Sequence, residues 1–182
     1  IIKHRLEKLN KIRSAGYEPY AYRFDKTASI SEVLERDTSD YENEFKVAGR
    51  IVSFRKMGKA SFINIQDETN RIQIYLKDEL LPTNIYNDIV RNLDLGDIIG
   101  CKGILFITKS GELSIKANNI IILSKNIRPL PNLKEKDGET FNAYEDKELR
   151  YRHRQLDLIA NPDVKKVFRT RSFIISTIRR FL

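Results

Sequence analysis

Apolar and polar residues alternate through most of residues 45–125, and this alternation constrains the fold more than any other feature of the chain. A period of two is typical of strands that bury one face. The predicted strands are residues 45–54, 60–67, 71–76, 98–108 and 112–117, with 120–123 as a sixth candidate. Between the third and fourth strands, residues 84–93 carry apolar side chains four positions apart, which predicts a short helix. Three strands, a helix and two strands predict an OB-fold, a five-stranded Greek-key barrel. Gly49, Gly100 and Gly103 suit the bends that close such a barrel.

The residues before the barrel predict a basic amphipathic helix. Apolar residues recur there at helical spacing and stop at Gly16, a natural helix terminator. The apolar stripe is Ile2, Leu6, Leu9 and Ile12, and the basic residues on the other sides are Lys3, Arg5, Lys8, Lys11 and Arg13. Such a helix packs on the barrel alone or also contacts phosphate groups. Ser29 followed by Glu32 predicts a capping box for a second, short helix.

The residues after the barrel predict a linker and then a long helix. Two prolines within residues 128–131 interrupt regular structure, and Asn161 with Pro162 matches the start of a helix. The apolar stripe of this helix continues to the end of the chain and needs a partner, either a core or another subunit. The expected divisions are 1–44, an N-terminal helical extension; 45–125, the barrel; 126–160, the linker; and 161–182, the start of a further domain. We expect the chain to be a fragment, because it begins with Ile1 and ends inside a helical pattern.

The basic residues gather at the two ends of the chain. The net charge is +8, and residues 1–20 hold five basic and two acidic residues, a net +3. Residues 150–182 hold nine and two, a net +7, which leaves −2 for the middle. Localised positive charge favours a polyanionic partner. A single cysteine, Cys101, and the lack of Cys/His clusters predict a cytoplasmic protein without disulfide or metal. No apolar run approaches the roughly 18 residues that span a membrane.

Two neighbouring strands predict a surface for unpaired bases. If Ile63 and Ile65 face the core, Phe62 points to the polar side of its strand. By the same alternation, Gln73 and Tyr75 point outward from the next strand and lie beside Phe62. OB-folds bind ligands on these strands and on the loops that join strands one to two and four to five. Single-stranded RNA requires such an aromatic platform, with polar groups for base edges and cations for phosphates.

Glu112 lies at the mouth of the turn between the last two predicted strands. A carboxylate only accepts hydrogen bonds and repels phosphate, so beside a polyanion it is best explained by a base N–H, such as uracil N3–H. Gln73 offers a donor and an acceptor for the same base edge. Two other interpretations stay open: Phe62 covered by the N-terminal helix, and Glu112 as a solvated hairpin carboxylate.

Seven runs, in order along nearly the whole chain, resemble those of bacterial-type class II lysyl-tRNA synthetases. They are residues 47–50, 57–62, 66–67, 71–75, 111–114, 128–131 and 150–159. The resemblance implies that Phe62 stacks on an anticodon uracil. It further implies that Gln73 and Glu112 read the central base, with Arg55 assisting nearby. Lys59, Lys11 and Arg13 are candidate phosphate contacts.

The same resemblance implies that residues 161–182 start a class II catalytic domain, whose motif 1 helix builds a homodimer interface. The complete enzyme would activate lysine with ATP and Mg²⁺ and transfer it to tRNA(Lys). The later motifs of the class are absent from this sequence. We therefore expect no catalytic residue and no cofactor here, but recognition of the tRNA(Lys) anticodon stem-loop.

Three other functions fit parts of the sequence. An aspartyl or asparaginyl synthetase has the same barrel and reads an anticodon whose central base is also uracil. Residues 57–62 and 150–159 favour a lysyl-tRNA synthetase over these two. A general single-strand-binding OB-fold would show little base preference and would leave residues 161–182 unexplained. A purely structural dimerisation fragment accounts only for residues 164–182.

Overall fold

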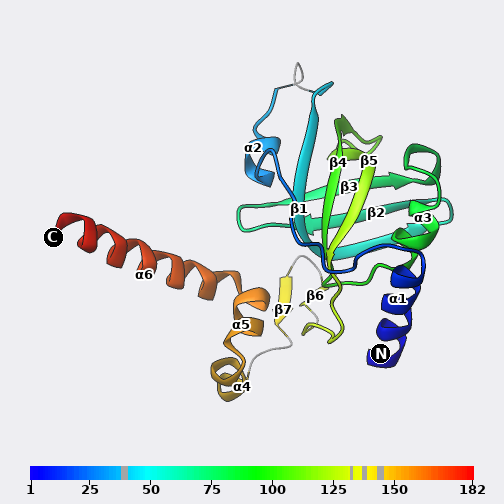
Figure 1. Cartoon of the computed structure of the whole chain (residues 1–182). Coiled ribbons are helices and arrows are strands. Elements are labelled where there is room, and N and C mark those ends of the chain that lie inside the picture. Colours follow the sequence, from blue (N-terminus) through cyan, green and yellow to red (C-terminus); the bar gives the residue numbers. More distant parts are fainter. Residues whose placement is uncertain (38–40, 132, 137–138, 143–145) are drawn as a thin grey trace. The chain divides into compact units, whose positions relative to one another are not determined.

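The structure is a computed structural model that describes residues 1–37, 41–131, 133–136, 139–142 and 146–182. It divides into two compact units, Ile1–Pro129 and Leu130–Leu182. The first unit holds the barrel and the helices that precede it, and the second holds the elements after the barrel (Figure 1).

A closed barrel of five strands forms the body of the first unit (Figure 1). The strands are β1 (Glu44–Met57), β2 (Ala60–Gln66), β3 (Arg71–Lys77), β4 (Ile98–Ile107) and β5 (Leu113–Ser124). Around the barrel they follow the order β1-β2-β3-β5-β4. Neighbours pair antiparallel, except that β3 and β5 pair parallel. This topology confirms the predicted OB-fold.

The last two predicted strands are one continuous strand, β5. Residues 120–123 are therefore in a strand as predicted, but they do not form a separate sixth strand. The pairing of β5 with β4 shifts register where Lys102 faces Asn119 and Gly103 faces Ala117. Asn118 is the extra residue at this irregularity and is exposed. A bulge of this kind interrupts the alternation of buried and exposed residues without ending the strand.

Alternation along the strands fills the barrel with branched apolar side chains. Ile63 and Ile65 of β2 are fully buried, as are Ile74 and Leu76 of β3. These four were expected to face inward, and burial of each such side chain contributes about 1.5–3 kcal/mol. The polar or aromatic residues between them consequently face outward.

Glycines in β1 and β4 allow strands and loops to approach closely. A Cβ on Gly103 would lie 2.2 Å from the carbonyl oxygen of Lys116, and one on Gly49 would lie 2.9 Å from a backbone oxygen of β2. At Gly100, the Cβ would lie 2.7 Å from the ring of Phe24. The first two positions confirm that glycine is needed where strands meet, whereas Gly100 makes room for the side chain of Phe24, which comes from the segment before the barrel.

The helix predicted over residues 84–93 is two short pieces. They are α3 (Ile85–Asp88) and the 3-10 turn η3 (Val90–Asn92). Another 3-10 turn, η2 (Asp78–Leu80), lies before them and directly follows β3. Ile85, Ile89 and Leu93 are nevertheless buried, as their spacing predicts. A segment this short has little helical stability of its own, so packing against the barrel decides its conformation.

The N-terminal helix, α1 (Ile2–Ser14), buries only the second half of the expected apolar stripe. Leu9 and Ile12 are buried, but Ile2 and Leu6 are 47% and 42% exposed. Arg5 is buried instead, and its guanidinium donates to the carbonyl oxygens of Leu95 and Asn126 at 3.1 and 2.9 Å. The predicted stripe was wrong in the first half of α1, because this half packs on backbone carbonyls rather than on apolar side chains.

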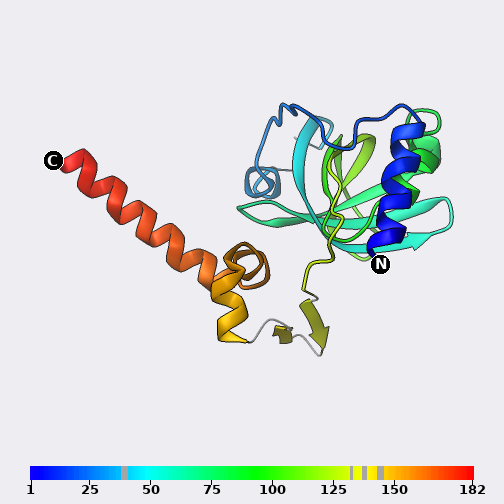
Figure 2. The same cartoon turned by 60° about the horizontal axis from the view of Figure 1, so that its bottom comes forward.

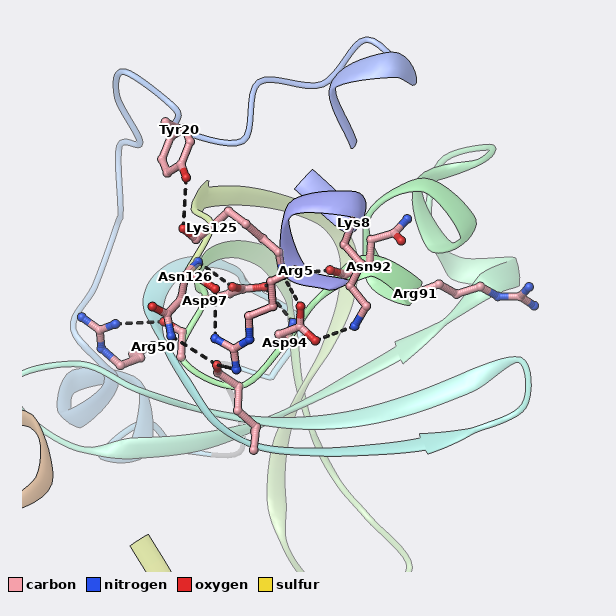
Figure 3. A network of polar contacts seen from close by, with 12 residues as sticks. Arg5, Lys8, Tyr20, Arg50, Arg91, Asn92, Asp94, Asp97, Lys125 and Asn126 are labelled. Carbon is pink, nitrogen blue, oxygen red and sulfur yellow. Dashed lines mark hydrogen bonds and ion pairs between the residues drawn. The ribbon is translucent and has the colours of Figure 1, made fainter. Parts of the chain in front are cut away.

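A buried network of charges fastens α1 to the barrel (Figure 3). Lys125 directly follows β5, and its Nζ lies 2.7 Å from Asp97 Oδ2 and 2.6 Å from Asp94 Oδ2. Asp94 also accepts a hydrogen bond from Lys8 of α1 at 2.5 Å. Burial alone would raise the pKa of the Asp94 carboxyl, but Lys125 and Lys8 outweigh burial and hold this pKa below its ordinary value. Figure 2 shows α1 as the helix at the N-terminus, and it contacts the 3-10 turn η3.

The short helix α2 (Ile30–Leu34) begins with the capping box predicted from the sequence. The Ser29 hydroxyl accepts a hydrogen bond from the backbone N–H of Glu32, and the Glu32 carboxylate accepts one from the backbone N–H of Ser29. A carboxylate oxygen of Asp67 also accepts the N–H of Ile30 at 2.9 Å, which joins α2 to the turn between β2 and β3.

The described residues of the second unit form two paired strands and three helices. The elements are β6 (Leu133–Lys136), β7 (Glu139–Asn142), α4 (Lys147–Arg152), α5 (Arg154–Ala160) and α6 (Pro162–Phe181). The stretch expected to be a linker, residues 126–160, therefore holds regular structure. Asn161 precedes α6 as expected, but its side chain donates to Asp157 at 2.6 Å instead of capping the helix.

Helix α6 leaves most of its apolar side chains exposed in the second unit. They include Val167, Phe168, Phe173, Ile174, Ile175, Ile178 and Phe181. Within the part of the chain that the structure describes, no helix is long and apolar enough to cross a membrane. An apolar face of this extent on a charged helix is typical of a surface that packs against another part of a protein.

Candidate nucleic-acid interface

Three aromatic side chains form a continuous patch on the outside of the barrel, which we call the aromatic face. Pairing of β2 with β3 sets Phe62 opposite Tyr75, and their ring centroids are 5.0 Å apart. The ring of Phe106, from β4, lies 5.8 Å from that of Tyr75. All three are half-buried, so part of each ring is open to solvent. The face therefore provides stacking surfaces for more than one base.

Phe62 and Tyr75 lie together as the alternation predicted, whereas Phe106 was missed. The same rule would have found it, because Phe106 follows the buried Leu105 in β4 and must point outward. Phe106 lies on β4, outside the strands β2 and β3 on which OB-folds most often bind ligands. The ring contacts of Phe62 are with Tyr75 and with the guanidinium of Arg55, whose central carbon lies 5.9 Å from the ring centroid.

A chain of hydrogen bonds borders the aromatic face, and the donor and the acceptor of each bond are fixed. Arg55 donates to Oε1 of Gln73 at 3.0 Å, and Nε2 of Gln73 donates to the Ser114 hydroxyl at 2.9 Å. The Ser114 hydroxyl then donates to the carbonyl oxygen of Glu112 at 3.2 Å. Because a guanidinium can only donate, Gln73 must present its oxygen to Arg55 and its nitrogen to Ser114. We call the side chains of Arg55, Gln73 and Ser114 the polar chain.

Gln73 points outward as predicted, but it is only 3% exposed. Arg55 and Ser114 hold its amide on both sides, so the amide has one N–H and one lone pair left for a ligand. Ser114 is fully buried beneath it. Gln73 is thus a fixed group at the floor of the site rather than a freely moving surface side chain.

Glu112 occupies the turn between β4 and β5, where its backbone is held on both sides. Its carbonyl oxygen accepts the N–H of Thr108 at 3.0 Å, and its own N–H donates to the Thr108 hydroxyl at 3.0 Å. Gly111, with φ of 81°, forms the bend of this turn. The Glu112 side chain is exposed, so its carboxylate is open to a hydrogen-bond donor.

The predicted cations fall into two groups. Arg55 belongs to the polar chain, and Lys59 is exposed in the loop between β1 and β2. Lys11 and Arg13 are exposed on α1 and do not belong to the aromatic face or to the polar chain. The structure therefore brings Arg55, Phe62 and Gln73 together and leaves Lys11 and Arg13 as a separate basic surface.

Groups suited to metal or thiol chemistry do not occur at this site. Within the described ranges, no cluster of three or more His, Cys, Asp or Glu side chains is placed to hold a metal ion. Cys101 is buried in β4, and burial raises the pKa of its thiol to about 12. The site offers stacking, hydrogen bonding and positive charge, which are the interactions that bind nucleic acids.

Comparison with protein families gives the class of this domain. Residues 45–123 match the model of the tRNA anticodon family, described as an OB-fold nucleic acid binding domain. Over these residues the barrel is therefore similar to the tRNA anticodon-binding OB-fold domains.

Comparison with individual proteins identifies the particular relatives, which are lysine–tRNA ligases. The chain is 44% identical over 189 residues to that of Aliarcobacter butzleri, an alignment that covers 99% of this chain and 36% of the relative. It is 42% identical over 182 residues to that of Carboxydothermus hydrogenoformans, covering 100% of this chain and 36% of the relative. The chain thus spans about a third of the length of these relatives, and the resemblance to lysyl-tRNA synthetases is confirmed.

Proposed function

We propose that this chain is the anticodon-recognising part of a lysine–tRNA ligase. The observation that carries the proposal is the aromatic face beside the polar chain, on the outer surface of an anticodon-binding barrel. The whole length of the chain aligns with lysine–tRNA ligases, which supports tRNA(Lys) as the partner. The complete enzyme would act in translation, in the cytoplasm, and would activate lysine with ATP and Mg²⁺ through residues that lie outside this chain.

Phe62 and Glu112 have complementary roles in this proposal. The exposed part of the Phe62 ring stacks on an anticodon uracil, and the Arg55 guanidinium beside it faces the negative backbone. The exposed carboxylate of Glu112 accepts the N3–H of the central uracil, a hydrogen that cytosine lacks. Gln73, fixed by Arg55 and Ser114, presents its remaining N–H and lone pair toward the same base edge.

The exposed apolar side chains of α6 support the second part of the proposal. Residues 161–182 would begin the catalytic domain, and the apolar stripe from Val167 to Phe181 would be covered by that domain and by a second subunit. Residues 126–160 would connect this domain to the barrel. The proposal thus assigns RNA recognition to the first unit and homodimer formation to the complete protein.

The test is binding of this chain to a Lys anticodon stem-loop and to a stem-loop with C in place of the central U. We expect a clear preference for U at both low and moderate salt. Phe62→Ala is expected to weaken binding by about 1–3 kcal/mol, the usual contribution of one stacked base. Phe62→Leu, which keeps an apolar side chain but removes the aromatic ring, separates stacking from folding.

Tyr22→Ala is the matched control, because Tyr22 is fully exposed outside the barrel strands and should leave binding unchanged. Equal affinity for the two RNAs, weakening together as salt rises, would refute base recognition and leave a general single-strand-binding OB-fold. Unchanged binding by both Phe62 variants would remove the aromatic face from the proposal.

A further inference from the structure

A second surface of the first unit, which we call the basic groove, has the composition of a phosphate-binding site. It is a hollow of about 630 Å³ bordered by Lys8 and Lys11 of α1, by Lys56 near the end of β1, and by Asp88 and Arg91 of the α3–η3 segment. All the described residues that border the groove are polar or charged. Such a lining suits a hydrated anion such as a phosphodiester, and it does not suit an apolar peptide or a lipid chain.

Positive charge in the basic groove exceeds what its own acidic residues neutralise. Lys8 is already paired with Asp94, at 2.5 Å. Lys56 donates to the carbonyl oxygen of Arg91 at 3.0 Å, which satisfies a hydrogen bond but leaves its charge in place. Lys11, Lys56 and Arg91 thus contribute three positive charges against one negative charge from Asp88.

The positive charges in the basic groove also repel one another. Burial lowers the pKa of Lys56, and the neighbouring charge of Lys8 lowers it further. An incoming anion would relieve this repulsion. The position of α1 in the groove is fixed, because Arg5 and Lys8 hold this helix against the barrel through partly buried hydrogen bonds (Figure 3).

The basic groove and the aromatic face meet at one strand. Arg55 and Lys56 are consecutive residues of β1, and successive side chains of a strand point to opposite sides. Arg55 extends toward Phe62 and Gln73, whereas Lys56 extends toward η3. A ligand that follows the end of β1 therefore passes from one surface to the other.

We infer that the basic groove binds backbone phosphates of the same RNA whose anticodon bases lie on the aromatic face. The inference rests on the proposed function for the identity of the RNA. The groove adds affinity without base preference, because it offers only charge and hydrogen bonds to phosphate. Base recognition then stays with the aromatic face and the polar chain.

The test is the salt dependence of stem-loop binding by the chain and by its double variant Lys11→Gln/Arg91→Gln. Both side chains are exposed, so the substitutions should leave the fold and its thermal unfolding unchanged. Removing two phosphate contacts should reduce the slope of log K against log salt by roughly 1.4 on single-stranded RNA, or 1.8 on a duplex. The ratio of affinities for the U and C stem-loops should stay the same.

The matched control is Lys26→Gln/Lys46→Gln, which removes the same charge at the opposite end of β1, where Thr27 donates to the carbonyl oxygen of Lys46. Equal slopes for the two double variants would overturn the inference and leave the proposed function standing. Loss of slope only in the groove variant, without any preference for U in the unaltered chain, would support the groove and refute base recognition. Loss of binding to vesicles of anionic lipid, with unchanged RNA binding, would overturn the assignment to RNA.

Discussion

Replacing Lys125 with methionine is expected to destabilise the barrel strongly. The side chain of Lys125 is fully buried, and its ammonium contacts Asp97, Asp94 and the carbonyl oxygen of Asn92 at 2.7, 2.6 and 3.0 Å. Methionine has a similar length and fills the same space without a charge. The substitution therefore removes the ion pairs while largely preserving the packing.

The expected loss of unfolding free energy is about 3–5 kcal/mol, the usual result of leaving a buried charge without its partner. Asp97 sets this magnitude, because its carboxylate is fully buried and would retain only the backbone N–H groups of Asp94 and Asn126. Asp94 is less affected, since Lys8 still pairs with it.

Lys102→Met is the matched control, measured by urea unfolding alongside Lys125→Met. Lys102 lies 2.7 Å from Glu44, the same separation as Lys125 from Asp97, but the side chains of Lys102 and Glu44 are both exposed by more than a third. An exposed pair contributes about 0–1 kcal/mol. A loss below roughly 1 kcal/mol for Lys125→Met, or one equal to that of the control, would refute the argument from burial.

The difference in stability should also depend on pH in a definite direction. Burial raises the pKa of the Asp97 carboxyl, and the charge of Lys125 opposes this rise. Lys125→Met removes the positive charge that lowers the pKa of Asp97. In this variant the pKa of Asp97 in the folded chain therefore lies further above its value in the unfolded chain, 3.8. The destabilisation is therefore greatest above the folded pKa and shrinks as pH falls through it. A difference that stays constant as pH falls from 7 toward about 4 would contradict this assignment.

Two further predictions concern the capping box and the buried thiol. Ser29→Ala should reduce the unfolding free energy by about 1 kcal/mol, because it removes the hydroxyl that caps α2. Ser29→Asp retains a capping oxygen and is the control that should keep this stability; equal stability of the alanine variant and the unaltered chain in urea would contradict the prediction. Cys101 should resist a thiol reagent at pH 8 until the chain unfolds, since burial raises its pKa to about 12; rapid labelling of the folded chain would refute its burial.

The strands of the barrel were predictable because burial alternates regularly wherever the pairing is regular. The rule failed at Asn118, where a bulge interrupts the alternation and one strand looked like two. It also failed for residues 84–93, whose apolar spacing is helical although the segment is too short to hold one continuous helix. In both places a tertiary contact, rather than a local preference, decides the structure.

The candidate site was predictable only in part for a related reason. Alternation places Phe62 and Tyr75 on one face, and the same rule applies to Phe106. The burial of Gln73 depends on Arg55, 18 residues away, and on Ser114, 41 residues away. No periodicity within a strand reports on such contacts, so the sequence alone indicated an accessible amide where the structure has a fixed one.

The buried network around Lys125 connects the stability of the barrel to the proposed binding of RNA. Arg5 of α1 bonds to carbonyl groups 90 and 121 residues away, and Lys8 bonds to Asp94, 86 residues away. Buried or partly buried pairs of this kind are screened by salt much less than exposed charges are. Helix α1 should therefore remain docked at salt concentrations that weaken contacts between exposed lysines and phosphate. It follows that a fall in RNA affinity with salt reports on the loss of phosphate contacts, and not on detachment of the helix that carries Lys11.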